Sequence, residues 1–129
     1  MTQKKIVSLQ IGNAELNTPR NFVSSYLDLL PLINDWTNDT QISLSNYLPN
    51  DGGEYEITVS GAIEGFMALY VHSDACENLI GIIQSEPNGV SCSSAVVPIG
   101  ANRTLVVHGI PWGKVTPTFF HISGYRRIN

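Results

Sequence analysis

From Gln41 to the end of the chain, the hydrophobic pattern repeats every second residue, and this period constrains the fold more than any other feature. In residues 55–60, Tyr55, Ile57 and Val59 alternate with polar side chains. Such alternation is typical of a strand with one buried face and one wet face. A parallel α/β fold would need crossover helices between its strands, and no segment of this region fits one.

Turn segments rich in glycine, proline, asparagine and aspartate separate the alternating runs. Besides a first run near residues 42–47 and the run at 55–60, strands are expected at residues 66–72, 78–84, 90–99, 103–108 and 118–128. The turns between them fall at residues 49–53, 73–74, 87–89, 100–102 and 111–113. Strands spaced in this way predict an all-β domain over residues 41–129, an antiparallel, jelly-roll-like β-sandwich.

Residues 1–40 are expected to form a separate N-terminal region. Residues 5–11 alternate like a short half-buried strand and are followed by a turn at Gly12. Thr18 then supplies a capping hydroxyl and Pro19 suits a first helical position, which together predict one short helix over residues 19–30. Pro31 ends this helix, and the residues up to 40 form a polar connector with a single aromatic anchor, Trp36.

The apolar face of the expected helix consists of side chains at three- and four-residue steps: Phe22, Tyr26, Leu29 and Leu30. Two roles are open for it. The helix either attaches the protein to a larger particle or covers one open edge of the sandwich, and edge covering is the commoner use.

Composition limits the class of protein. The chain has 129 residues, which fits one domain with one core, and 43% of them are hydrophobic, which is too many for a disordered chain. No apolar run approaches the roughly 20 residues of a bilayer span, so no membrane insertion is expected. The start lacks the pattern of a signal peptide, so synthesis in a cytoplasm is expected.

Only 14% of the residues are charged. Because charges are depleted in the centres of interfaces, this low fraction favours a surface partly covered by identical neighbours. An ordinary β-rich monomer with a sparsely charged surface is the alternative.

The charges are unevenly distributed along the sequence. Residues 1–86 contain all eleven acidic and three basic residues, a net charge of −8, whereas residues 87–129 contain only four basic residues, a net charge of +4. Strands from the two segments are therefore expected to pair charges across a sheet, or the basic segment faces an acidic partner. Four dispersed cations make a poor phosphate-binding surface, so no nucleic-acid partner is expected.

No catalytic motif stands out, and neither a catalytic residue nor a cofactor is expected. His72, Asp74 and Cys76 occupy alternate positions, but a zinc site would need a fourth ligand at a recognised spacing, so no metal is expected either. Cys76 and Cys92 either form a disulfide or remain reduced thiols, and the sequence leaves both states open.

Trp112 and Lys114 are the best candidates for a binding site. A flat indole ring on a tight loop beside a cation suits stacking on a sugar or contact with a protein surface. Asn102 and Arg103 are expected nearby, because adjacent strand ends of a sandwich share a rim. The alternative is that the Trp112 ring folds back and closes the end of the sandwich.

Three segments carry a resemblance to a known family. They are residues 42–57, residues 96–107 around the turn at Gly100, and the final run Gly124-Tyr125-Arg126-Arg127-Ile128. Together they resemble the C-terminal β-domain of tailed-bacteriophage fibres and head fibres, over about residues 41–129. The resemblance implies a trimeric sandwich on a virion appendage that offers its outer loops to a host surface. About forty residues precede the domain, which leaves no room for a shaft and favours a head-fibre, capsid-decoration or fibre-tip subunit.

The same resemblance implies the partners and the location. They are two further copies of the chain, a capsid or tail protein, and a glycan or protein of the host surface, with the protein itself on the virion surface. Phe119, Tyr125 and Arg126 are the candidate trimer interface, and Gly124 allows a neighbouring ring to approach closely. An ordinary final strand is the alternative for these residues. For the function, the alternatives are a monomeric carbohydrate-binding module that uses Trp112 or Tyr70, and a small hydrolase.

Overall fold

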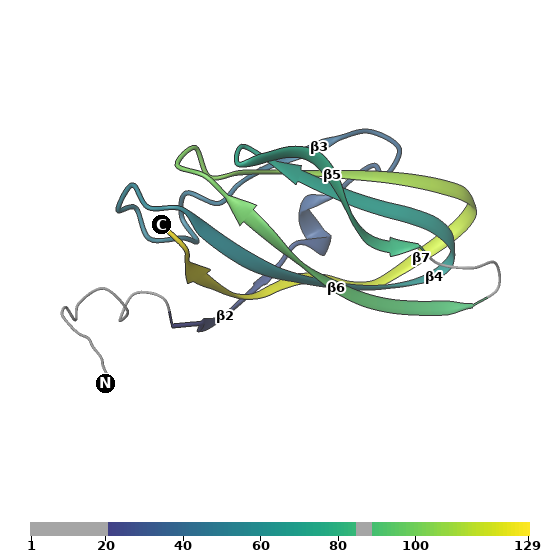
Figure 1. Ribbon diagram of the computed structural model, residues 1–129. Helices are drawn as coiled ribbons and strands as arrows, with labels where there is room; N and C mark the ends of the chain where they lie inside the picture. Colours follow the sequence, from purple (N-terminus) through teal and green to yellow (C-terminus); the bar gives the residue numbers. More distant parts are fainter. Residues whose placement is uncertain (1–20, 85–88) are drawn as a thin grey trace, which may run out of the picture.

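The computed structural model describes residues 21–84 and 89–129 and shows an all-β protein with one antiparallel sheet (Figure 1). Its elements are β2 (Val23–Asp28), the 3-10 helix η3 (Leu30–Leu32), β3 (Thr40–Ser43), β4 (Tyr55–Ser73), β5 (Cys76–Gln84), β6 (Val90–Ile99) and β7 (Thr104–Arg127). The strand expected at residues 5–11 and the turn after it lie outside the described residues.

Two long strands organise the sheet. β4 has 19 residues and β7 has 24, and they pair antiparallel from Tyr55 opposite Arg127 to Ser73 opposite Leu105. Along its other edge, β4 pairs first with β6 and then with β5. Along the other edge of β7, β3 and β2 pair with its beginning and its end. The six described strands thus form an open sheet.

The sheet has two halves. The β2 half contains β2, residues 116–127 of β7, residues 55–64 of β4, and β6. The β3 half contains β3, residues 104–111 of β7, residues 67–73 of β4, and β5. Figure 1 shows β4 and β7 curving back between the halves, at the end of the molecule away from the C-terminus.

Glycines with positive φ mark this bend. The register of β4 and β7 shifts between Gly65 and Met67, and Gly65 has φ +106° while Gly113 on β7 has φ +115°. A bulge bends a strand and increases its twist, and glycine adopts these backbone angles without steric cost. The two strands therefore change direction together, and their pairing continues on both sides of the bulge.

One hydrophobic core joins the halves. Its buried side chains include Ile57, Val59, Leu69, Val71, Leu105, Val107, Phe120 and Ile122. At Gly61 a Cβ atom would lie 3.2 Å from Cδ1 of Ile83, so the β2 half and β5 pack closely there. Trp36 packs edge-on against Phe120 with ring centroids 6.0 Å apart, which confirms its role as the anchor of the connector.

The prediction of a helix at residues 19–30 is wrong for its described part, residues 21–30. Residues 23–28 form the edge strand β2, followed by the single 3-10 turn at Pro31. Pairing with the end of β7 decides the conformation, because Val23 lies opposite Tyr125 and the Leu29 amide donates to the Phe120 carbonyl at 2.8 Å. The expected capping residues Thr18 and Pro19 lie outside the described residues.

The turn expected at Pro111-Trp112-Gly113 is also wrong, because all three residues lie within β7. Likewise, the two strands expected at residues 55–60 and 66–72 are one strand, β4. The glycines there serve the bend rather than a chain reversal.

Other local predictions are confirmed. β6 spans Val90–Ile99 as expected, and β5 begins two residues earlier than expected, at Cys76. The turns after Ser73 and after Gly100 separate β4 from β5 and β6 from β7. The expected charge pairing across the sheet is present as well, since Arg126 lies opposite Glu56 and donates two hydrogen bonds to its Oε1 atom, at 2.9 and 2.5 Å.

Candidate binding surfaces

Arg103, one of the expected binding residues, is buried. Only 3% of it is exposed, and its guanidinium donates hydrogen bonds to the carbonyl oxygens of Pro49 (2.6 Å), Gly53 (2.6 Å) and Gly100 (3.0 Å). The guanidinium also lies 5.0 Å from the centroid of the Tyr55 ring. These contacts tie the loop before β4 to the turn before β7, so Arg103 stabilises the fold instead of facing a ligand.

Asp51 and Tyr55 surround this guanidinium. The Tyr55 hydroxyl donates to Asp51 at 2.6 Å, and this bond, followed by the Gly53 amide, lowers the pKa of the Asp51 carboxyl. Burial, then the bond to Asp51 and its negative charge, raises the pKa of Tyr55 to about 12. At neutral pH, Tyr55 is therefore a neutral phenol and Asp51 is a charged carboxylate.

The four expected binding residues do not share one rim. Arg103 directly precedes β7 and exposed Asn102 precedes it in the turn, whereas Trp112 and Lys114 lie at the bend. Thr104 and Trp112 are eight residues apart on the same strand, or about 26 Å at about 3.3 Å per residue. The structure therefore brings Trp112 together with Lys114 and separates both from the other pair.

The expected trimer interface is also divided between two faces. Tyr125 points inward and packs edge-on against Tyr47 and Tyr55, with ring centroids 5.5 and 5.6 Å apart. Phe119 and Arg126 lie on the opposite, outer face, because β7 alternates about buried Phe120 and Ile122 and has a bulge at Ser123. Tyr125 is thus half-buried and packs against the core.

The outer face of the β2 half carries a row of rings, which we call the β2 face: Phe22, Tyr26, His121 and Phe119. Tyr26 is 66% exposed, and its ring lies 4.9 Å from that of His121, which stacks on Phe119 at 5.2 Å. Phe22 is 53% exposed and contacts Gly124, where the absence of a side chain admits its ring as expected. Four residues were expected to form the apolar face of the helix. Phe22 and Tyr26 lie at the surface, whereas Leu29 is fully buried and Leu30 is half-buried.

The neighbours of the β2 face on β4 are small and uncharged. Ser60 lies opposite His121 and Ala62 lies opposite Phe119. The Nδ1 atom of His121 is buried and lacks a hydrogen-bond partner among the described residues. On β2, the exposed Asp28 lies opposite His121. The β2 face is therefore aromatic, with small neighbours on β4 and one carboxylate beside its centre.

A second outer surface follows the β3 half up to the bend, and we call it the bend strip: Phe66 and Tyr70 on β4 with His108, Ile110 and Trp112 on β7. Ala68 lies between Phe66 and Tyr70 and is only 1% exposed. Ala68 lies opposite Ile110, and Tyr70 lies opposite His108. Phe66 and Trp112 stack with ring centroids 4.5 Å apart and planes at 29°. Trp112 is 49% exposed, so it does not close the end of the molecule as the alternative interpretation held.

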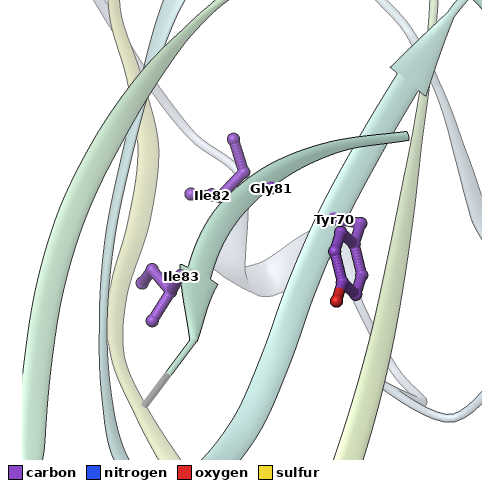
Figure 2. A pocket seen from close by; sticks show the side chains of 4 residues that line it. All are labelled: Tyr70, Gly81, Ile82 and Ile83. Atoms are coloured by element: carbon purple, nitrogen blue, oxygen red, sulfur yellow. The ribbon is translucent and has the colours of Figure 1, made fainter. Parts of the chain in front are cut away.

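A shallow hollow of about 200 Å³ lies beside Tyr70 (Figure 2). Its lining consists of the Tyr70 ring on one side and Gly81, Ile82 and Ile83 of β5 on the other. Gly81 leaves the space open, because even a Cβ atom there would come no closer than 3.8 Å to the Tyr70 ring. Of these four lining residues, only Tyr70 carries a titratable side chain.

Phe66, His108 and Ile110 belong to the bend strip but are not among the binding residues expected from the sequence. The positions 108, 110 and 112 alternate in the sequence and so belong to one face of a strand. The expected turn at residues 111–113 concealed this signal, because it ended the strand before Trp112.

The described residues contain no cluster of three or more His, Cys, Asp or Glu side chains placed to hold a metal ion. Cys76 and Cys92 are free thiols. In the sheet, Cys76 lies opposite Ser73 and Cys92 lies opposite Ala62. Ser73 and Ala62 are eleven positions apart on β4, and a disulfide does not span that separation. Among the described residues, no helix is long and apolar enough to cross a membrane.

The comparisons with known proteins identify no relative. No protein-family model, no curated protein and no solved structure matches the chain significantly.

Proposed function

We propose that the chain is a non-enzymatic surface protein of a bacteriophage virion, a homotrimeric head-fibre, capsid-decoration or fibre-tip subunit. In this proposal the folded sheet is the jelly-roll-like sandwich of that class. Copies associate with each other, one part of the chain contacts a capsid or tail protein, and another surface contacts the host. The class comes from the sequence resemblance, and the self-association is supported by the β2 face.

The observation that carries the self-association is the exposure of Tyr26 on β2, an edge strand among the described strands, and of Phe22 directly before it. Large apolar side chains at a sheet edge favour contact with another chain, and native proteins otherwise protect such edges with charges or covering segments. The aromatic rings of the β2 face match the composition of interface cores, in which aromatic residues are enriched, and Asp28 is the charged residue that lies beside them.

Sedimentation velocity of the wild type and of Tyr26→Ser tests this assignment. The wild type is expected to sediment as a trimer at micromolar concentration, and Tyr26→Ser is expected to weaken assembly by at least about tenfold, because buried tyrosines dominate many interfaces. Trp112→Ser is the matched control, since it removes a similarly exposed ring outside the β2 face. If both variants assemble like the wild type, the β2 face is not the interface.

A monomeric carbohydrate-binding module is the second candidate function, and the exposed Trp112 favours it. The two candidates differ in oligomeric state, because only the first requires assembly.

A further inference from the structure

The bend strip presents a supported, half-open aromatic platform. Phe66 stacks on Trp112, and about half of the Trp112 surface remains exposed. The indole is therefore fixed in orientation and still accessible. An ordinary core tryptophan is covered by its neighbours, and an unsupported surface tryptophan loses rotamer entropy when it binds.

The backbone at the bend is shaped to place these two rings together. Gly65 directly precedes Phe66 and Gly113 directly follows Trp112, and both glycines have positive φ. A side chain at Gly65 would lie 2.5 Å from the carbonyl oxygen of Lys114, so the two strands approach closely there. Bulges of this kind re-aim side chains and are frequent beside functional sites.

The platform continues into a strip long enough for an extended ligand. On β7, Trp112 and His108 are four residues apart, or about 13 Å at about 3.3 Å per residue. Exposed Ile110 lies between them, and the Tyr70 ring lies near His108 with centroids 6.5 Å apart. The hollow beside Tyr70 extends the same surface toward β5.

The charges of the strip define the chemistry of its ligand. His108 is paired with Asp39 at 2.6 Å, and Lys114 is a single cation at the far end of the strip. The whole chain carries a net charge of −4, which disfavours polyanions such as nucleic acids or sulfated glycans. A ligand that suits the strip is flat, uncharged and apolar on one face, with polar groups at its rim.

From these observations we propose that the bend strip binds a neutral oligosaccharide, with one pyranose ring stacked on Trp112. The C–H groups on one face of a pyranose suit the open indole face, and its hydroxyl groups suit polar atoms at the margin, such as the Tyr70 hydroxyl. This inference rests on the proposed function, which has one surface of the protein contact the host. It identifies the bend strip as that surface and a glycan as its ligand.

An array of neutral oligosaccharides, containing hexasaccharides of glucose, N-acetylglucosamine, mannose and galactose, tests the inference on the full chain. Sialylated and sulfated glycans serve as anionic comparisons. The strongest neutral hexasaccharide is then titrated calorimetrically into the wild type and the variants. Trp112→Ala is expected to weaken binding by about tenfold or more, and Trp112→Phe to weaken it less, because a stacking ring remains.

Val96→Ala is the control, since it truncates another exposed apolar side chain, on β6 and away from the strip, and it is expected to bind like the wild type. Binding of no neutral glycan, binding of anionic glycans alone, or equal affinity of the wild type and Trp112→Ala would each overturn the inference. Trp112→Ala is also expected to keep the oligomeric state of the wild type. A failure of the glycan test is thus distinguishable from a failure of the proposed assembly.

Discussion

At the scale of single residues, the buried Arg103 guanidinium connects three parts of the chain that are distant in sequence. Its acceptors lie in the loop at Pro49 and Gly53 and in the turn at Gly100. We expect Arg103→Lys to lower the free energy of unfolding by about 3 kcal/mol or more, because an ammonium cannot reach three carbonyl groups in the planar geometry of a guanidinium. Urea unfolding measures the change.

Arg126→Lys is the control for this measurement. Arg126 pairs with Glu56 at the surface and is about half exposed, so the substitution is expected to cost less than about 1 kcal/mol. Equal effects of the two substitutions would contradict the structural role of Arg103.

Tyr55 predicts a stability change at high pH. Its pKa is raised from 10.0 to about 12, so the folded protein binds the phenolic proton more tightly than the unfolded chain does. The stabilisation is present below pH 10 and is lost as the pH rises through 12. The unfolding free energy of the wild type is therefore expected to fall more steeply between pH 10 and 12 than that of Tyr55→Phe. Parallel pH profiles of the two proteins would show that Tyr55 does not contribute.

The role of Arg103 was beyond the reach of the sequence. The sequence shows a cation next to a turn, which ordinarily indicates an exposed side chain. Its burial depends on a loop about fifty residues earlier that closes over it, and Tyr55 lies beneath its guanidinium only after β4 pairs with β7. Local patterns do not encode such contacts.

At the scale of elements, the bend between the two halves depends on glycine, and this yields a graded prediction. Gly113→Ala is expected to cost about 1–3 kcal/mol from backbone strain alone, because no atom lies within 4 Å of the added Cβ. Gly65→Ala is expected to cost more, because it adds a collision with the Lys114 carbonyl to similar strain. Gly81→Ala, with its nearest neighbour at 3.8 Å, is expected to stay within about 0.5 kcal/mol of the wild type.

Thermal and urea unfolding of the three glycine variants measure this order. If Gly65→Ala is as stable as Gly81→Ala, the bulge at the bend does not have the described geometry.

The same elements show how far local patterns reach. Alternation located the strand regions after Gln41, and the bounds of β6 were predicted without error, because period two reports directly on a strand with two different faces. The prediction divided β4 and β7 too often, since a glycine with positive φ serves a bulge as well as it serves a turn. The helix was predicted wrongly because the spacing of Phe22 and Tyr26 fits a helix, whereas pairing with β7 is a long-range effect.

At the scale of the whole molecule, the described arginines are all paired with carboxylates of the same chain. Arg103 and Arg127 lie 3.6 and 3.8 Å from Asp51, and Arg126 pairs with Glu56. Three arginines of the basic second segment are thus paired with two carboxylates of the acidic first segment within one sheet. The outer surfaces that remain, the β2 face and the bend strip, are aromatic and sparsely charged, which is the basis for assigning them to self-association and to glycan binding.

Self-association is the claim on which the proposed function most depends, and light scattering coupled to size exclusion tests it most directly. The measurement gives the molar mass of the wild-type protein in solution at micromolar concentration. Our account predicts a mass three times the 14.1 kDa of a single chain. A mass of 14.1 kDa across the accessible concentration range would contradict it.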